Sequence, residues 1–143
     1  MNSQMKNTET RWVEELPDGT IHNPANAWHF MRIKPVAGTV RVTRDAEVLA
    51  ESAGAVRLIE VGRDFYDPVI YLPRSDVLVE LVDSPETTHC PLKGDAIYFD
   101  LASDEVTVSK IAWSYPDPFP FAAEITLMIA FFPQHVTIEE RPF

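Results

Sequence analysis

Short stretches of alternating apolar and polar residues, separated by prolines, dominate the chain from residue 39 onward. The first, TVRVTRDAEVLAES at 39–52, alternates on both sides of Asp45-Ala46 and predicts a β-hairpin. Its expected inward-facing side chains are Val40, Val42, Val48 and Ala50. Further strands are expected in VRLIEV, DPVIYLP, DVLVELV, GDAIYFDLA, VTVSKIAW, ITLMIAFF and HVTIEE.

The prolines favour many short strands joined by stiff turns. The chain has 12 prolines and 5 glycines, and Pro68, Pro73 and Pro85 stand at expected strand ends, where no donor of a sheet is lost. A turn is expected at 103–105, and FAAEI at 121–125 is expected to form one or two helical turns. These features predict a mostly-β, antiparallel protein with the strand spacing of barrels and sandwiches.

The length and composition predict one domain. A chain of 143 residues that is 45% hydrophobic can bury one core and is too short to need two. We expect a single β domain at 30–143, preceded by a polar N-terminal extension at 1–29 with two proline turns in ELPDGTIHNPAN. The extension is expected to cover the body or to pair with a second subunit, which would make a homodimer.

The charge and the cysteine content exclude several classes of partner. The formal net charge of −10 disfavours binding to nucleic acid and to anionic membranes. The single cysteine cannot form an intrachain disulfide, and MNSQMKNTETRWVEE contains no apolar stretch typical of a signal peptide. The longest apolar runs are about half of the roughly 20 residues that a membrane-spanning helix needs. We therefore expect a cytoplasmic protein that binds neither nucleic acid nor membrane.

The stretch TTHCPLKGDAIYF at 87–99 is the leading candidate for a functional site. Pro91 restricts Cys90 to extended geometry, so His89 and Cys90 should project to opposite faces of their strand and are not expected to share a metal ion. Gly94 can adopt a positive φ in a tight turn, which would place Lys93 at the mouth of the sheet. Beyond the turn, Gly94, Ala96 and Tyr98 share one face and predict a shallow recess.

A second candidate stretch is AWSYPDP at 112–118. Trp113 and Tyr115 fall on the same side of an extended chain and carry polar groups that could hold a ligand, or they pack at the rim of the sheet. Lys93 is either a site residue or a solvated turn lysine. Cys90 is either an inert buried thiol or a nucleophile activated by Lys93 or by protonated His89. Arg57 and Glu60 either contribute charge to a cleft or form a solvated ion pair.

Together the two stretches resemble domain-of-unknown-function family 427 (DUF427), whose pattern is THCPxKGxAxY followed by AWxYPxP. The resemblance extends to VRVTRDAEVLAES, DPVIYLPRSDV and MIAFFPQHVTIE, and covers about residues 30–140. It implies a β-tent fold, in which two small antiparallel sheets lean together. It also places seven residues at motif positions, namely His89, Cys90, Lys93, Gly94, Tyr98, Trp113 and Tyr115. Zinc, which relatives in the wider fold carry on two cysteine pairs, is not implied for a chain with one cysteine.

Three functions follow from these residues. The first is a small-molecule binding module for an anionic or carbonyl-bearing ligand, with Lys93, Gly94, Tyr98, Trp113 and Tyr115 around a shared pocket. The second is an enzyme with Cys90 or Lys93 as nucleophile and His89 or Tyr98 as proton carrier. The third is a structural or protein-interaction domain. No phosphate loop, nucleophile elbow or dinucleotide fingerprint is present in the sequence, and no cofactor is expected.

Overall fold

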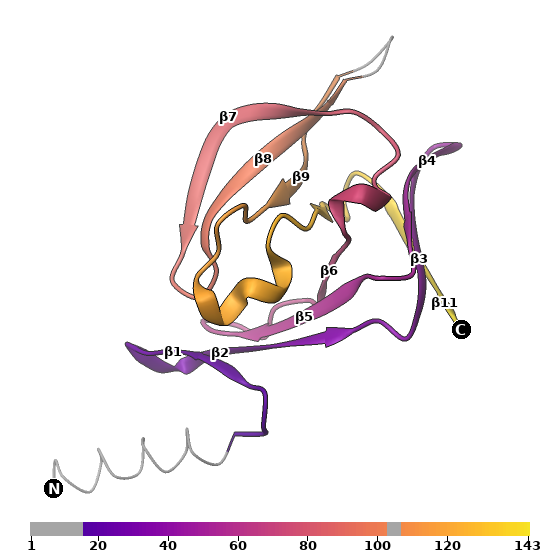
Figure 1. Cartoon of the computed structure of the whole chain (residues 1–143). Coiled ribbons are helices and arrows are strands. Elements are labelled where there is room, and N and C mark those ends of the chain that lie inside the picture. The colour runs from indigo at the N-terminus through magenta and orange to yellow at the C-terminus, as the bar shows by residue number, and fades with distance from the viewer. Residues whose placement is uncertain (1–15, 103–106) are drawn as a thin grey trace, which may run out of the picture.

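The computed structural model describes residues 16–102 and 107–143, and these form three antiparallel sheets (Figure 1). The first sheet has the order β1 (Ile21–Asn23), β2 (Asn26–Pro35), β5 (Val56–Val61), β6 (Val69–Tyr71). The second has the order β10 (Ala130–Phe131), β9 (Thr107–Ser114), β8 (Gly94–Ala102), β7 (Leu81–Cys90). The third has the order β11 (Thr137–Pro142), β3 (Gly38–Arg44), β4 (Glu47–Ser52).

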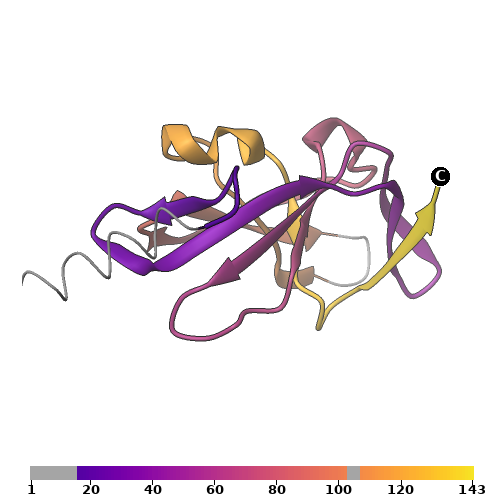
Figure 2. The same cartoon turned by 90° about the horizontal axis from the view of Figure 1, so that it is seen from below.

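Two short 3-10 segments, η1 (Arg74–Asp76) and η2 (Pro120–Ile125), are the helical elements of the described residues. The second sheet leans over the first, and the third stands at the end of the molecule away from the β7–β8 turn (Figures 1 and 2). The mostly-β, antiparallel fold class is therefore confirmed, with three sheets where the resemblance implied two. None of the helices in the described ranges has the length and apolar character needed to cross a membrane.

The core consists of two clusters of buried side chains, one at each junction between sheets. The cluster toward the third sheet joins Val40, Val42 and Leu49 to residues of the second sheet such as Phe99 and Ile111. The largest side chains of the cluster between the first and second sheets are Met31, Ile33, Leu58, Tyr71, Leu92, Tyr115, Ile125 and Met128. Each sheet thus buries one face against another, which is how antiparallel sheets remove apolar surface from water.

The 39–52 hairpin is confirmed, with one change in its inward face. β3 and β4 are joined at Asp45-Ala46, and Asp45 adopts a φ of 53°. Val42 pairs with Ala50 but Thr43 pairs with Val48, so Leu49 is the extra residue of a bulge. Leu49 is fully buried and Val48 only partly, because the bulge interrupts the alternation that the sequence predicted for Val48.

The stretch DVLVELV was predicted as one strand, and that prediction is wrong. Its start closes the 3-10 turn η1, and the pairing of β7 begins only at Leu81 and continues to Cys90. Pro85, expected at a strand end, lies inside β7. It is tolerated there because β7 is the edge strand of its sheet and the register shifts between Asp83 and Thr87.

Part of the segment set apart as an N-terminal extension pairs in the first sheet. β1 and the start of β2 lie within residues 21–29, and β2 continues without a break past residue 30. Residues 1–15 of the expected extension and the expected turn at 103–105 lie outside the described residues.

Candidate functional site

The β7–β8 turn packs against the segment that follows β9, so the two sequence stretches meet. The backbone N–H of Phe119 donates to the carbonyl of Lys93 at 3.1 Å. Gly94 has the predicted positive φ, 109°, and a Cβ there would lie 3.4 Å from both Asp117 O and Pro118 Cα. Backbone of 117–118 therefore fills the space over Gly94, and Ala96 beside it is buried. The shallow recess predicted at these two residues is absent, because the second stretch closes it.

Lys93 turns inward and joins the second sheet to the first. Its Nζ donates to Oε1 of Glu60 on β5 and lies 5.8 Å from the centre of the Tyr115 ring. Only 8% of Lys93 is exposed, so the alternative of a solvated turn lysine is wrong. A lysine this deeply buried requires an anionic partner, and Glu60 is that partner.

Glu60 also binds His29, from β2. Its Oε2 lies 2.8 Å from His29 Nε2, and His29 Nδ1 lies 3.5 Å from Asn23 Nδ2. These contacts fit a ring whose Nε2–H donates to Glu60 and whose Nδ1 accepts from Asn23. Burial by itself would raise the pKa of Glu60, but the Lys93 ammonium and the hydrogen bonds from Lys93 and His29 outweigh it and hold the pKa below its ordinary value. Glu60 is thus a buried carboxylate that stays ionised.

Trp113 and Tyr115 lie at the cluster between the first two sheets. Trp113 Nε1 donates to the Tyr71 hydroxyl at 3.2 Å, and the two rings meet edge to face at 6.2 Å. Burial raises the pKa of Tyr71 and of Tyr115 above the ordinary tyrosine value, so both keep their hydroxyl protons. The two residues on the 112–118 stretch therefore serve mainly as packing at the sheet junction.

Tyr98 contacts Trp113 through a third aromatic ring. The two residues are directly paired across β8 and β9. Phe132 stacks on Tyr98 at 6.2 Å and contacts Trp113 at 4.5 Å between ring centres. The Tyr98 hydroxyl bonds Thr88 at 2.7 Å, and Lys110 Nζ lies 5.7 Å from the ring centre. Phe132 was not singled out from the sequence, because it lies far from both stretches along the chain.

His89 and Cys90 project to opposite sides of β7, as predicted. The His89 side chain is exposed, its Nδ1 lies 2.7 Å from Asp95 Oδ1, and its ring meets Phe119 edge to face at 6.0 Å. Cys90 is partly buried against the cluster between the first two sheets. Because both residues end the strand, both still border the same open space.

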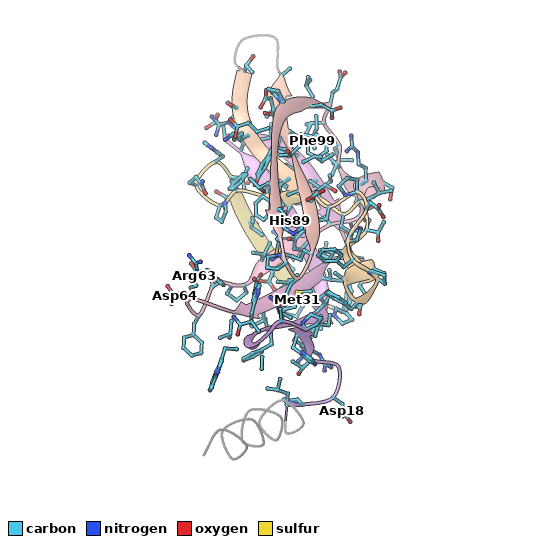
Figure 3. All side chains as sticks on the ribbon, turned by 90° about the vertical axis from the view of Figure 1, so that its left-hand side faces the viewer. Asp18, Met31, Arg63, Asp64, His89 and Phe99 are labelled. Carbon is cyan, nitrogen blue, oxygen red and sulfur yellow. The ribbon has the colours of Figure 1, made fainter. Side chains whose placement is uncertain are left out.

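That space is a cleft of about 500 Å³ between the end of β7 and the first sheet, here named the β5–β7 cleft. Its lining comes from the β1–β2 hairpin, the loop after β5 and the end of β7, which meet on one side of the molecule (Figure 1). Figure 3 views this side, with His89 above the loop that carries Arg63. The lining residues are Asn23, Asn26, His29, Glu60, Gly62, Arg63, Tyr66, His89, Cys90 and Pro91.

The structure therefore divides the predicted site residues into two groups. His89 and Cys90 line the β5–β7 cleft, whereas the other predicted residues, Lys93, Gly94, Tyr98, Trp113 and Tyr115, lie outside its lining. Lys93 is connected to the cleft only through its ion pair with Glu60, which is a lining residue. One feature of the sequence pointed to Glu60. It lies two residues after Leu58 in VRLIEV, so both side chains share the buried face of the strand, and a buried charge requires a partner. Arg57, considered with it, pairs instead with Glu140 of β11.

Metal ligation has no candidate among the described residues, which contain no group of three or more His, Cys, Asp and Glu side chains placed to hold an ion.

In comparisons with known proteins, the profile of a family described as a domain of unknown function (DUF427) matches residues 32–141. A search of curated proteins gives no match.

Proposed function

The chain belongs to the DUF427 family, and we propose that it is a small-molecule binding module whose ligand lies in the β5–β7 cleft. One observation carries the proposal: an open cleft of about 500 Å³ lies over a buried, fully paired ion network at the junction of two sheets. Its volume falls within the roughly 300–1,000 Å³ that small-molecule sites occupy.

The Lys93–Glu60–His29 network supports binding by keeping the cleft in a defined shape. Lys93 ties the β7–β8 turn to β5, and His29 ties β2 to the same carboxylate. The cleft walls therefore come from three segments that one glutamate holds in place. A preformed site of this kind loses little conformational entropy when a ligand binds.

A fragment screen followed by amide NMR of the ¹⁵N-labelled full chain tests the proposal. Ligands are expected to shift the amides of Gly62, Arg63 and Cys90, and to protect Cys90 from alkylation. Because Cys90 is the only cysteine, N-ethylmaleimide attaches there alone and should abolish binding. The Cys90→Ser variant treated with the same reagent should keep binding. Ligands that shift only amides remote from the cleft, or that bind equally well after alkylation, would contradict the proposal.

A second candidate is an enzyme that uses Cys90 as nucleophile. The observation in its favour is that Cys90, His89 and His29 line one cleft, which brings a thiol and two imidazoles to the same ligand volume. Lys93 is a weaker nucleophile candidate, because its amine is paired with Glu60 and lies behind the lining.

The rate of Cys90 alkylation by iodoacetamide at neutral pH separates this candidate from simple binding. An activated thiol is expected to react faster than N-acetylcysteine and to slow in His89→Ala or His29→Ala, while His135→Ala, remote from the cleft, changes nothing. A rate at or below that of the free thiol would leave the binding module as the function.

A further inference from the structure

We infer that the ligand of the β5–β7 cleft is a small organic carboxylate, an inference that rests on the proposed function and names its ligand class. The side-chain oxygens of the lining that can only accept hydrogen bonds are already engaged. Asn23 Oδ1 accepts from the N–H of Ala25 at 2.9 Å, and Asn26 Oδ1 accepts from the N–H of Trp28 at 3.1 Å. Both oxygens of Glu60 are bound, to Lys93 and to His29. Each amide and carboxylate oxygen of the lining side chains therefore already accepts a hydrogen bond from the protein itself.

Two groups of the lining that can only donate remain open to a ligand. Within residues 16–102 and 107–143, the guanidinium of Arg63 forms no ion pair and Nδ2 of Asn26 no hydrogen bond. The Tyr66 hydroxyl can act in either role. With Nδ1 bound to Asp95, His89 Nε2 accepts in the neutral ring and donates when the ring carries both protons. With Arg63 and Asn26 supplying its open donor-only groups, the lining favours a ligand rich in acceptors.

The charge balance of the lining indicates that the ligand is also negatively charged. The Glu60 carboxylate is already matched by the Lys93 ammonium, so the unmatched formal charge of the lining is that of Arg63. A guanidinium presents parallel N–H groups that fit the two oxygens of a carboxylate. An anionic ligand with a planar acceptor group is the best complement.

The loop backbone favours a carboxylate over a phosphate. Phosphate sites commonly use several free backbone N–H groups, as in anion-binding nests. Here the N–H of Gly62 donates to Asp64 O at 3.0 Å, that of Tyr66 to Glu60 O at 3.2 Å, and that of Phe65 to Asp64 Oδ1 at 2.7 Å. With these amides engaged and one guanidinium available, the cleft matches one negative charge rather than two.

One exposed ring suggests a flat ligand body. A Cβ on Gly62 would lie 3.2 Å from His29 Cδ2 and 3.3 Å from Tyr66 Cε2, so both rings close over the glycine and leave no room between them there. Tyr66 lines the cleft and is 45% exposed, so the open part of its ring favours contact with an aromatic or other planar group. The carboxylate is then expected at Arg63 and the planar body against Tyr66.

The test compares 2-naphthoate, 2-naphthamide and 2-naphthyl phosphate by amide NMR titration of the full chain. We expect naphthoate to shift the Gly62, Arg63 and Cys90 amides with an affinity at least tenfold above that of the amide. Arg63→Gln should weaken naphthoate binding about tenfold, which corresponds to about 1.4 kcal/mol. Arg41→Gln, an exposed arginine on β3 paired with Glu51, is the matched control and should change nothing.

Each other outcome overturns the inference. Equal binding of acid and amide, tighter binding of the phosphate at the same amides, an unaffected Arg63→Gln variant, or no shift with naphthoate would each exclude a carboxylate site. Neutral or cationic ligands from the fragment screen that still bind in the cleft would then leave the binding module intact. Failure of that screen as well would remove the proposed function together with its ligand class.

Discussion

Two lysines, Lys93 in the β7–β8 turn and Lys110 on β9, each pair with a glutamate, and the two pairs differ in burial. Lys93 and Glu60 are 11% and 12% exposed as side chains, and they join the second sheet to the first. Lys110 and Glu86 are 40% and 56% exposed, and they join two strands of one sheet. Ion pairs of the same chemistry therefore have different roles: the buried pair holds two sheets together, whereas the exposed pair lies on the surface of one sheet.

The difference follows from desolvation. An exposed pair loses little hydration and contributes little, whereas a buried charge that loses its partner is left without either water or a counter-charge. The cleft is bordered by the buried pair, so its shape should depend on Lys93 and be indifferent to Lys110.

The largest expected change in stability is that caused by removing Lys93, compared with removing Lys110. Lys93→Ala should lower the free energy of unfolding by about 3–5 kcal/mol, because Glu60 is left buried with only His29 as partner. Lys110→Ala should cost less than about 1 kcal/mol. Urea denaturation followed by tryptophan fluorescence measures both. Equal losses would mean that burial does not distinguish the two pairs.

A variant with both partners replaced sharpens this comparison. Lys93→Met combined with Glu60→Gln leaves no buried charge unpaired, so its loss should be smaller than the sum of the two single losses. Additive losses would show that the two side chains stabilise the junction independently.

The turn that presents Lys93 gives the next largest effect. Gly94→Ala places a side chain at a φ of 109° and against backbone of 117–118, and should cost about 1–3 kcal/mol. Gly54→Ala is the control, since its Cβ would meet nothing closer than 3.5 Å. Thermal unfolding of both variants is the measurement. A Gly94→Ala protein as stable as Gly54→Ala would mean that the turn can relax.

A smaller effect is expected from pH. Because the folded-state pKa of Glu60 lies below its ordinary value of about 4.5, its contribution to stability is present above that pH and is lost as the pH falls through the folded pKa. The stability difference between the wild type and Glu60→Gln should therefore shrink below about pH 4.5. Glu86→Gln is the control, because an exposed ion pair contributes less than about 1 kcal/mol to stability. Denaturation curves across pH 3–7, roughly the range over which carboxyls titrate, measure both.

The smallest effect concerns two tyrosine hydroxyls. Tyr71→Phe removes the acceptor of the Trp113 indole N–H at the buried junction and should cost about 1 kcal/mol. Tyr98→Phe removes an exposed bond to Thr88 and should change stability by less than about 0.5 kcal/mol. Chemical denaturation resolves the two values. A larger loss for Tyr98→Phe would reverse the ranking of the two regions.

The parts of the fold that were predicted correctly are those set by the pattern of neighbouring residues in the sequence. The hairpin at 39–52, the strand GDAIYFDLA and the positive φ of Gly94 all depend on residues that are neighbours in sequence. The errors arose where pairing decides the outcome. Leu49 took the buried place expected for Val48 because of a bulge set by β3, and Pro85 entered a strand because that strand has a free edge.

The candidate site was harder to predict because its parts are far apart along the chain. Alternation, proline and glycine positions determined strand content, the inward face of most strands and the turn before Gly94, since these are short-range preferences of the backbone. Only the tertiary structure decided that Lys93 and His29 both bind Glu60, and that His89 and Cys90 share a cleft with Arg63. A charge on one strand does not specify which distant charge will neutralise it; the packing of two sheets does.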